Sequence, residues 1–169
     1  MRRPHALGFE VTIIDPVTSE GERVSSSAVR TALAAGEFAH AARLLGRPYT
    51  MRGRVVRGEQ LGRRLGYPTA NMRIERRRSP LGGIFAVRAH RIAAQPLAAV
   101  ASLGTRPTVA GTATLLETHV FDFDGDLYGR EIEIEFVDKI RDELRFDGLD
   151  ALVAQMHRDA AAARAILAA

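Results

Sequence analysis

A segment that begins at Gly62 reads Gly-Arg-Arg-Leu-Gly-Tyr-Pro-Thr-Ala-Asn and combines residue types that can bind phosphate and a metal ion. Gly62 and Gly66 would let backbone amides approach phosphate oxygens closely, and Arg63 could neutralise those oxygens. On a strand, Thr69 and Asn71 would face the same side and present oxygen atoms there. Mg²⁺ on a nucleotide accepts a few neutral oxygens alongside the phosphates. By glycine spacing alone, a glycine-rich hairpin turn before an ordinary strand explains the segment more often than a ligand site does.

Two common phosphoryl-transfer motifs are absent from the sequence. No G-x-x-x-x-G-K-[ST] pattern occurs, and the single lysine, Lys139, lies in no such setting. The catalytic loop of protein kinases is also missing. Any transfer of phosphate by this chain would therefore need a different scaffold.

The elements that would position these residues are mostly strands. Alternation and turn residues predict six strands, near residues 50–57, 70–75, 84–90, 97–103, 114–123 and 131–136. Six short strands without intervening helices favour an antiparallel barrel or sandwich. Apolar residues recur at helical spacing from Leu149 to Met156, so a helix is expected at the C-terminus. The predicted fold class is mainly β.

The N-terminal segment, residues 1–45, has a different pattern. A short strand is expected near residues 8–16, and two short helices near 28–35 and 37–45. These elements cannot bury a core alone. The segment must pack on something else or be a fragment of a larger domain.

The composition excludes several classes of site. The chain has 169 residues, no cysteine and a net charge of +4, and its basic residues are arginines apart from Lys139. Disulfides, zinc–thiolate sites and thiol nucleophiles are thereby excluded. Without a long apolar run or a secretory signal, no membrane association and a cytoplasmic location are expected. The basic surface is either simply solvated or suited to a polyphosphate ligand.

Five segments together resemble the riboflavin kinase module of the bacterial bifunctional riboflavin kinase/FMN adenylyltransferase family. The phosphate-site segment contains the family's P-T-A-N centre. Four further matches follow in the same order: G-G-I-F-A-V from Gly82, L-G-T-R-P-T from Leu103, L-E-T-H-V from Leu116 with the D-x-Y-G-like turn after it, and I-R-D-E-L-R-F from Ile140. One such motif is weak, but five in order are strong.

This resemblance implies a six-stranded antiparallel, Greek-key-type barrel with a C-terminal helix. It also implies transfer of the γ-phosphoryl group of MgATP to the 5′-hydroxyl of riboflavin, which gives FMN and ADP. The implied partners are therefore riboflavin, FMN, ATP and ADP, without nucleic acid or membrane. By position in the motifs, the nucleotide-binding residues would be Gly62, Arg63, Gly66, Thr69 and Asn71, with Thr69 and Asn71 also holding Mg²⁺.

The resemblance places Glu117 on the family's catalytic base. A primary alcohol needs a proton acceptor as it attacks phosphorus, and Glu117 would share a strand face with His119. The histidine either supports that carboxylate or is a packed structural residue. Arg141 and Phe146 are predicted to contact the flavin, although Phe146 could instead anchor the last helix. Tyr128 is expected to be structural.

The N-terminal segment resembles the end of the adenylyltransferase domain of the same family, through S-S-S-A-V-R from Ser25. The rest of that domain, with its H-x-G-H nucleotide site, finds no match in residues 1–6. The predicted organisation is a remnant with linker helices at residues 1–45 and a riboflavin kinase domain at residues 46–169. FMN adenylyltransferase activity is expected to be absent.

Two alternatives remain at this point. A small basic barrel could bind single-stranded nucleic acid, but that class interleaves aromatic and basic residues on its sheet, and aromatics make up only 6% of this chain. A non-catalytic flavin or nucleotide sensor could keep the same pocket. The joint presence of Thr69, Asn71 and Glu117 favours the enzyme.

Overall fold

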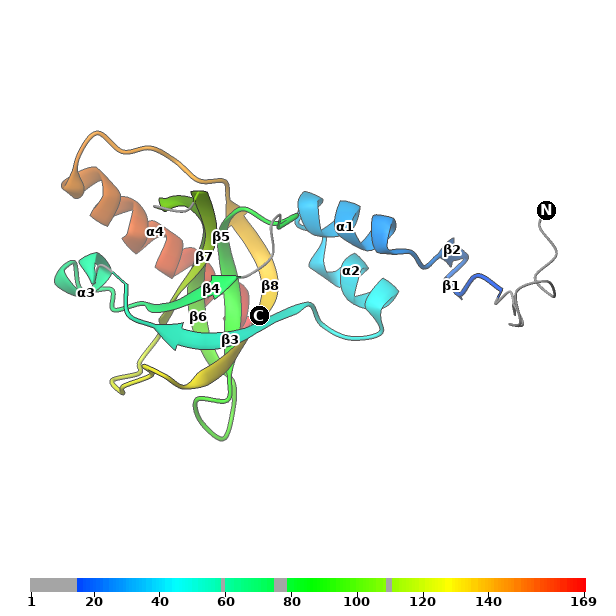
Figure 1. The fold of residues 1–169 in the computed structure, drawn as a ribbon, viewed down its shortest axis with the longest axis horizontal. Coiled ribbons are helices and arrows are strands. Elements are labelled where there is room, and N and C mark those ends of the chain that lie inside the picture. The colour runs from blue at the N-terminus through cyan, green and yellow to red at the C-terminus, as the bar shows by residue number, and fades with distance from the viewer. Residues whose placement is uncertain (1–14, 59, 75–78, 109–110) are drawn as a thin grey trace.

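A computed structural model describes the chain at residues 15–58, 60–74, 79–108 and 111–169 (Figure 1). The strand predicted near residues 8–16 falls outside these ranges except for its last two residues, which lie in no strand.

Six strands form one closed barrel in the order β3-β4-β7-β6-β5-β8. They are β3 (Thr50–Val56), β4 (Ala70–Ile74), β5 (Gly83–His90), β6 (Leu97–Thr108), β7 (Gly111–Val120) and β8 (Glu131–Arg141). Every neighbouring pair is antiparallel. Strands β5, β6 and β7 follow one another as neighbours, and β8 returns to lie beside β5, which is a Greek-key arrangement. The predicted six-stranded antiparallel barrel with a C-terminal helix is confirmed.

The strict alternation of apolar and acidic residues along β8 shows why this segment forms a barrel strand. Ile132, Ile134 and Phe136 are buried in the core, while Glu133 and Glu135 between them remain partly exposed. Side chains of a strand alternate between its two faces, so one face fills the barrel and the other meets water. The prediction of a strand with one wet face is confirmed here, although β8 continues beyond the predicted end to Arg141.

Two N-terminal helices share the hydrophobic core of the barrel. Helix α1 (Ser26–Ala35) is capped by the Ser25 side chain, which accepts a hydrogen bond from the Ala28 amide at 3.1 Å. Helix α2 (Phe38–Leu45) places Phe38 against Phe85 and Phe136, with ring centroids 5.9 and 5.8 Å apart. The core is therefore continuous across the predicted boundary between residues 45 and 46, and the two-part division stays a prediction.

A two-stranded hairpin precedes these helices and extends away from the barrel (Figure 1). Its strands are β1 (Thr18–Ser19) and β2 (Glu22–Arg23), which lie between the strand and the first helix predicted from the sequence. The His40 ring on α2 lies 2.7 Å from Glu22 of the hairpin and 3.1 Å from Glu37. Hydrogen bonds that these carboxylates accept, chiefly Glu22, raise the pKa of His40 above its ordinary value of 6.5. The His40 ring thus links the hairpin to α2.

The long C-terminal helix α4 (Leu149–Ala168) packs on the barrel wall through small residues. Ala160 and Ala163 lie in a cluster with Ala86 and Phe121, and small side chains allow the helix to approach the sheet closely. A one-turn helix, α3 (Leu61–Arg64), lies with the start of α4 on the side of the barrel opposite α1 and α2 (Figure 1). In the part of the chain that the structure describes, no helix has the length and apolar character needed to cross a bilayer.

Candidate active site

The loop between β3 and β4 is held together by its own backbone. The amide of Leu65 donates to the Gly62 carbonyl at 3.0 Å, and the amide of Tyr67 donates to the same carbonyl at 2.8 Å. A side chain at Gly62 would collide with the carbonyl oxygen of Tyr67, and Gly66 adopts φ +83°. Both glycines are therefore needed for the shape of the loop. Their predicted role beside a nucleotide stays a prediction.

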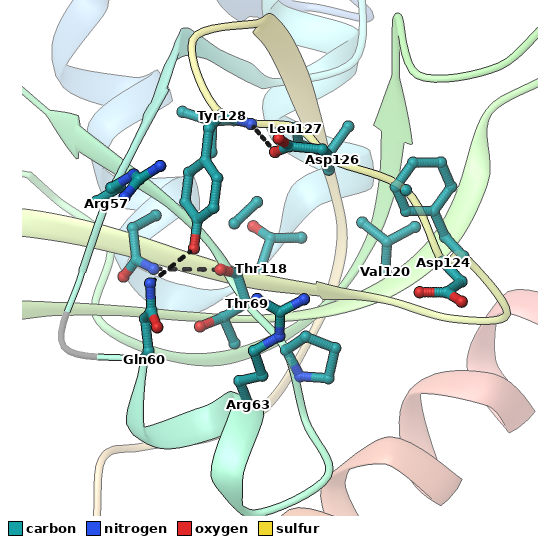
Figure 2. Close-up of a pocket in the computed structure, with 16 residues that line it drawn as sticks. Arg57, Gln60, Arg63, Thr69, Thr118, Val120, Asp124, Asp126, Leu127 and Tyr128 are labelled. Carbon is teal, nitrogen blue, oxygen red and sulfur yellow. Dashed lines mark hydrogen bonds between the residues drawn. The ribbon is translucent and has the colours of Figure 1, made fainter.

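A polar pocket of about 530 Å³ opens beside this loop (Figure 2). Its wall carries positively charged side chains, negatively charged side chains and an aromatic ring. The guanidinium of Arg57 lies over the Tyr128 ring at 5.2 Å, and the Gln60 amide is 3.5 Å from the Tyr128 hydroxyl. The lining residues are Val55, Arg57, Gln60, Arg63, Pro68, Thr69, Ala70, Asn71, Thr118, Val120 and residues 123–128.

Three of the predicted nucleotide-site residues, Arg63, Thr69 and Asn71, line this polar pocket. Gly62 lines a second pocket instead, and Gly66 lines neither. Tyr128, which was expected to be structural, also faces the polar pocket and presents its ring there (Figure 2).

The second pocket, of about 290 Å³, is walled mainly by apolar side chains. It contains the three remaining predicted residues, Glu117, Arg141 and Phe146. The other lining residues are Leu61, Gly62, Leu65, Tyr67, Thr69, Ile84, Val100, Ala101, Ser102, His119, Glu143, Leu144, Leu152, Met156 and Asp159. We call this cavity the apolar pocket.

The two pockets meet at Thr69, which lines both of them. The register of the barrel strands shows which other residues are neighbours at this junction. Asn71 of β4 lies directly opposite Glu117 of β7, and Glu117 lies opposite Ser102 of β6. Residues directly opposite one another across strands share a face of the sheet. The predicted metal-site residues and the predicted base are therefore neighbours at the junction of the pockets.

The side chain of Asn71 is held in one orientation. It is 6% exposed, and its Nδ2 donates to the backbone carbonyl of Thr69 at 3.2 Å. Gly58 leaves room for it, because a Cβ at Gly58 would lie 2.8 Å from the Cγ and Nδ2 atoms of Asn71. The side-chain carbonyl oxygen of Asn71 and the hydroxyl of Thr69 belong to residues that line the same polar pocket. Two neutral oxygens of this kind fit Mg²⁺ that is shared with nucleotide phosphates.

Arg141 has an internal partner. Its Nε and Nη2 donate to the two carboxylate oxygens of Asp159 on α4, at 2.9 and 2.6 Å, and Asp159 is 5% exposed. Gln155 donates to the same carboxylate at 2.8 Å. The guanidinium also lies 5.9 Å from the centre of the Phe146 ring. Arg141 thus ties the end of β8 to α4 and supports Phe146, and the predicted flavin contact of both residues stays a prediction.

His119 supports the backbone beside Thr69. Its Nδ1 donates to the carbonyl of Pro68 at 2.9 Å, and its ring packs edge-on against Tyr67 with centroids 4.9 Å apart. This histidine lines the apolar pocket with Glu117. It holds the residue immediately before Thr69 against β7.

Several pocket residues were not predicted from the sequence. They are Arg57, Gln60, Asp124 and Asp126 in the polar pocket, and Ser102, Glu143, Leu144, Met156 and Asp159 in the apolar pocket. Most of them lie within or beside the matched motifs, which gave a local signal. Met156 and Asp159 carried no such signal, because only the docking of α4 brings them to the site.

Comparison with known proteins agrees with this geometry. The family model for Flavokinase, described as riboflavin kinase, matches residues 45–167. A bifunctional riboflavin kinase/FMN adenylyltransferase of Pseudomonas fluorescens is 49% identical over 162 residues, which are 95% of this chain and 52% of that protein. The chain therefore spans about half the length of the curated relatives it matches.

Two solved structures have a similar fold. The structure of a Streptococcus pneumoniae protein described as a macrolide-efflux protein superposes with a TM-score of 0.77 and 38% identity, and covers 89% of this chain and 50% of that one. Riboflavin kinase from Trypanosoma brucei superposes with a TM-score of 0.52 and 28% identity over 71% of this chain and 80% of that one. With the family model matched over most of the barrel and α4, this chain belongs to the riboflavin kinase (Flavokinase) family.

Proposed function

We propose that this protein transfers the γ-phosphoryl group of MgATP to the 5′-hydroxyl of riboflavin, which gives FMN and ADP. The observation that carries the proposal is the meeting of a polar and an apolar pocket at Thr69, beside Asn71 and Glu117. A phosphoryl transferase must hold donor and acceptor in contact, because most of its catalysis comes from positioning and charge neutralisation. At this junction a donor in one pocket and an acceptor in the other would be in contact.

The polar pocket suits the nucleotide. Arg57 and Arg63 bring positive charge to its wall, and guanidinium groups bind phosphate oxygens through charged hydrogen bonds. The Tyr128 ring offers a flat surface on which a base can stack. Phosphates bound near Arg63 would reach Thr69 and Asn71, where Mg²⁺ would be held.

The apolar pocket suits the flavin. Leu65, Leu144, Phe146, Leu152 and Met156 supply apolar walls, as expected for a site that buries a planar ring system. Glu117 stands in the same pocket. A ribityl chain directed toward Thr69 would bring the 5′-hydroxyl toward both Glu117 and the γ-phosphate.

The chemistry follows from this placement. The Glu117 carboxylate accepts the proton of the 5′-hydroxyl as that oxygen forms its bond to the γ-phosphorus. The bond between the γ-phosphorus and the β,γ-bridging oxygen breaks, and ADP leaves with that oxygen. Arg63 stabilises the charge that spreads over the phosphoryl oxygens. Bound Mg²⁺ supplies further neutralisation of this charge.

The direct test is incubation of the purified protein with riboflavin, ATP and Mg²⁺, followed by chromatography of the flavins. FMN and ADP are expected in equal amounts, and chelation of divalent metal should stop their formation. If no FMN forms with Mg²⁺, Mn²⁺ or Zn²⁺, the proposed function is wrong.

The proposed metal site predicts a second result. Thr69→Ala and Asn71→Ala should each lower kcat/KM for MgATP by at least roughly 10–100-fold, a loss seen even for residues that only orient metal ligands. The midpoint of Mg²⁺ dependence should move to higher concentration, because an oxygen ligand is lost. Steady-state kinetics at several Mg²⁺ concentrations measure both effects.

Thr50→Ala is the matched control for this experiment, since Thr50 lies on β3 and outside both pockets. Its metal dependence should equal that of the unmodified protein. Unchanged metal dependence in both Thr69→Ala and Asn71→Ala would remove these residues from the metal site.

A further inference from the structure

One hydrogen bond joins the β3–β4 loop to α4. The Tyr67 hydroxyl lies 2.5 Å from Nδ1 of His157, and the two rings pack edge-on with centroids 5.4 Å apart. Tyr67 is the second residue before Thr69, and His157 follows Met156 on α4. The bond therefore connects the segment that meets the polar pocket with the helix that walls the apolar pocket.

In the part of the loop that the structure describes, few other contacts reach the barrel. None of the residues Leu61–Arg64, all of which the structure describes, is buried. The backbone bonds of Leu65 and Tyr67 to Gly62 are internal to the loop. In the described part of the loop, Gln60 binds the Tyr128 hydroxyl at 3.5 Å, and the Tyr67 end is attached to other elements through His119 and His157. His119 of β7 binds the Pro68 carbonyl and packs on Tyr67. Tyr67 is thus held between two histidines from different elements.

Helix α4 contacts both the β3–β4 loop and the apolar pocket. Toward the loop it presents His157, while Met156 lines the apolar pocket. Two residues beyond His157, Asp159 holds Arg141, whose guanidinium lies against the Phe146 ring. An adjustment of α4 on flavin binding would therefore be transmitted through His157 to Tyr67 and the adjoining Thr69.

We propose that the Tyr67–His157 pair is a positioning pair that couples occupancy of the two pockets, so that flavin bound in the apolar pocket favours nucleotide binding beside the β3–β4 loop. The inference rests on the proposed function. A ligand that fixes α4 and the loop lowers the ordering cost for the second ligand, and the same coupling must operate in both directions. Neither side chain takes part in the chemical step.

The test measures the dissociation constant of MgADP by calorimetry, with and without saturating FMN. The ratio of the two constants is the coupling factor, expected within the usual range of about 5–150 for the unmodified protein. Tyr67→Phe and His157→Ala should each reduce it by about three- to tenfold, as expected for loss of one hydrogen bond. The double variant should show no further reduction, because the two changes remove the same bond.

Arg164→Gln is the matched control. It removes another contact that ties α4 to the barrel, the ion pair with Asp122 at 2.8 Å, and leaves the loop untouched. A purely structural role would lower the melting temperature in Tyr67→Phe and Arg164→Gln alike without changing the coupling factor. A reduced coupling factor in the Tyr67 and His157 variants, with the control unchanged, supports the pair as a positioning device.

Three results would overturn the inference. They are a coupling factor of one in the unmodified protein, an unchanged factor in both single variants, and independent, additive losses in the double variant. Each of these leaves the proposed function standing if FMN is still made. Failure of the unmodified protein to bind either MgADP or FMN would instead overturn the proposed function, and the inference with it.

Discussion

Replacement of Glu117 by glutamine is expected to lower kcat for FMN formation by roughly 10²–10⁴-fold, the range typical for loss of a general base. Glutamine keeps the size of the side chain and can hydrogen-bond, but it cannot accept the proton of the 5′-hydroxyl. Glu117 lies in the apolar pocket, opposite Asn71 in the strand register. Binding of FMN and MgADP should persist, because the pocket walls are unchanged.

Single-turnover kinetics and calorimetry on the same preparation separate these effects. Glu133→Gln is a suitable control, since Glu133 also lies on a barrel strand but lines neither pocket. Its kcat should match that of the unmodified protein. A Glu117→Gln variant with nearly normal kcat would exclude this carboxylate as the base.

Replacement of Phe38 by alanine is expected to lower the free energy of unfolding by about 3–5 kcal/mol, the usual cost of deleting a buried phenylalanine side chain. Phe38 is 5% exposed and packs against Phe85 of β5 and Phe136 of β8. Its removal would leave a cavity between α2 and the barrel. A loss of this size is a large part of the stability of an ordinary domain.

Urea unfolding followed by circular dichroism measures this change. Arg43→Ala, at an exposed position on the same helix, should change the free energy of unfolding by less than about 0.5 kcal/mol. FMN formation by the folded fraction should be nearly unaffected in both variants, because Phe38 lines neither pocket. A loss below about 1 kcal/mol for Phe38→Ala would show that α1 and α2 contribute little to the barrel core.

Sequence patterns alone predicted a strand-rich fold, either a barrel or a sandwich, and the chemistry-bearing motifs, and the resemblance carried by those motifs implied the barrel. Alternating residues such as those of β8 specify a strand with one buried face, and turn residues separate one strand from the next. The P-T-A-N segment and the four motifs after it identified the family, and the family match confirms that identification. Local patterns were sufficient for these features because strand alternation and motif order are properties of neighbouring residues.

Only the tertiary structure determined which partners those residues contact. Strand register placed Asn71 opposite Glu117, and docking of α4 gave Arg141 a buried partner in Asp159 and Tyr67 a partner in His157. Helices α1 and α2, which looked like a remnant in the sequence, have Phe38 in the barrel core. None of these pairings has a local signature, because each depends on long-range packing of segments that are far apart in the chain.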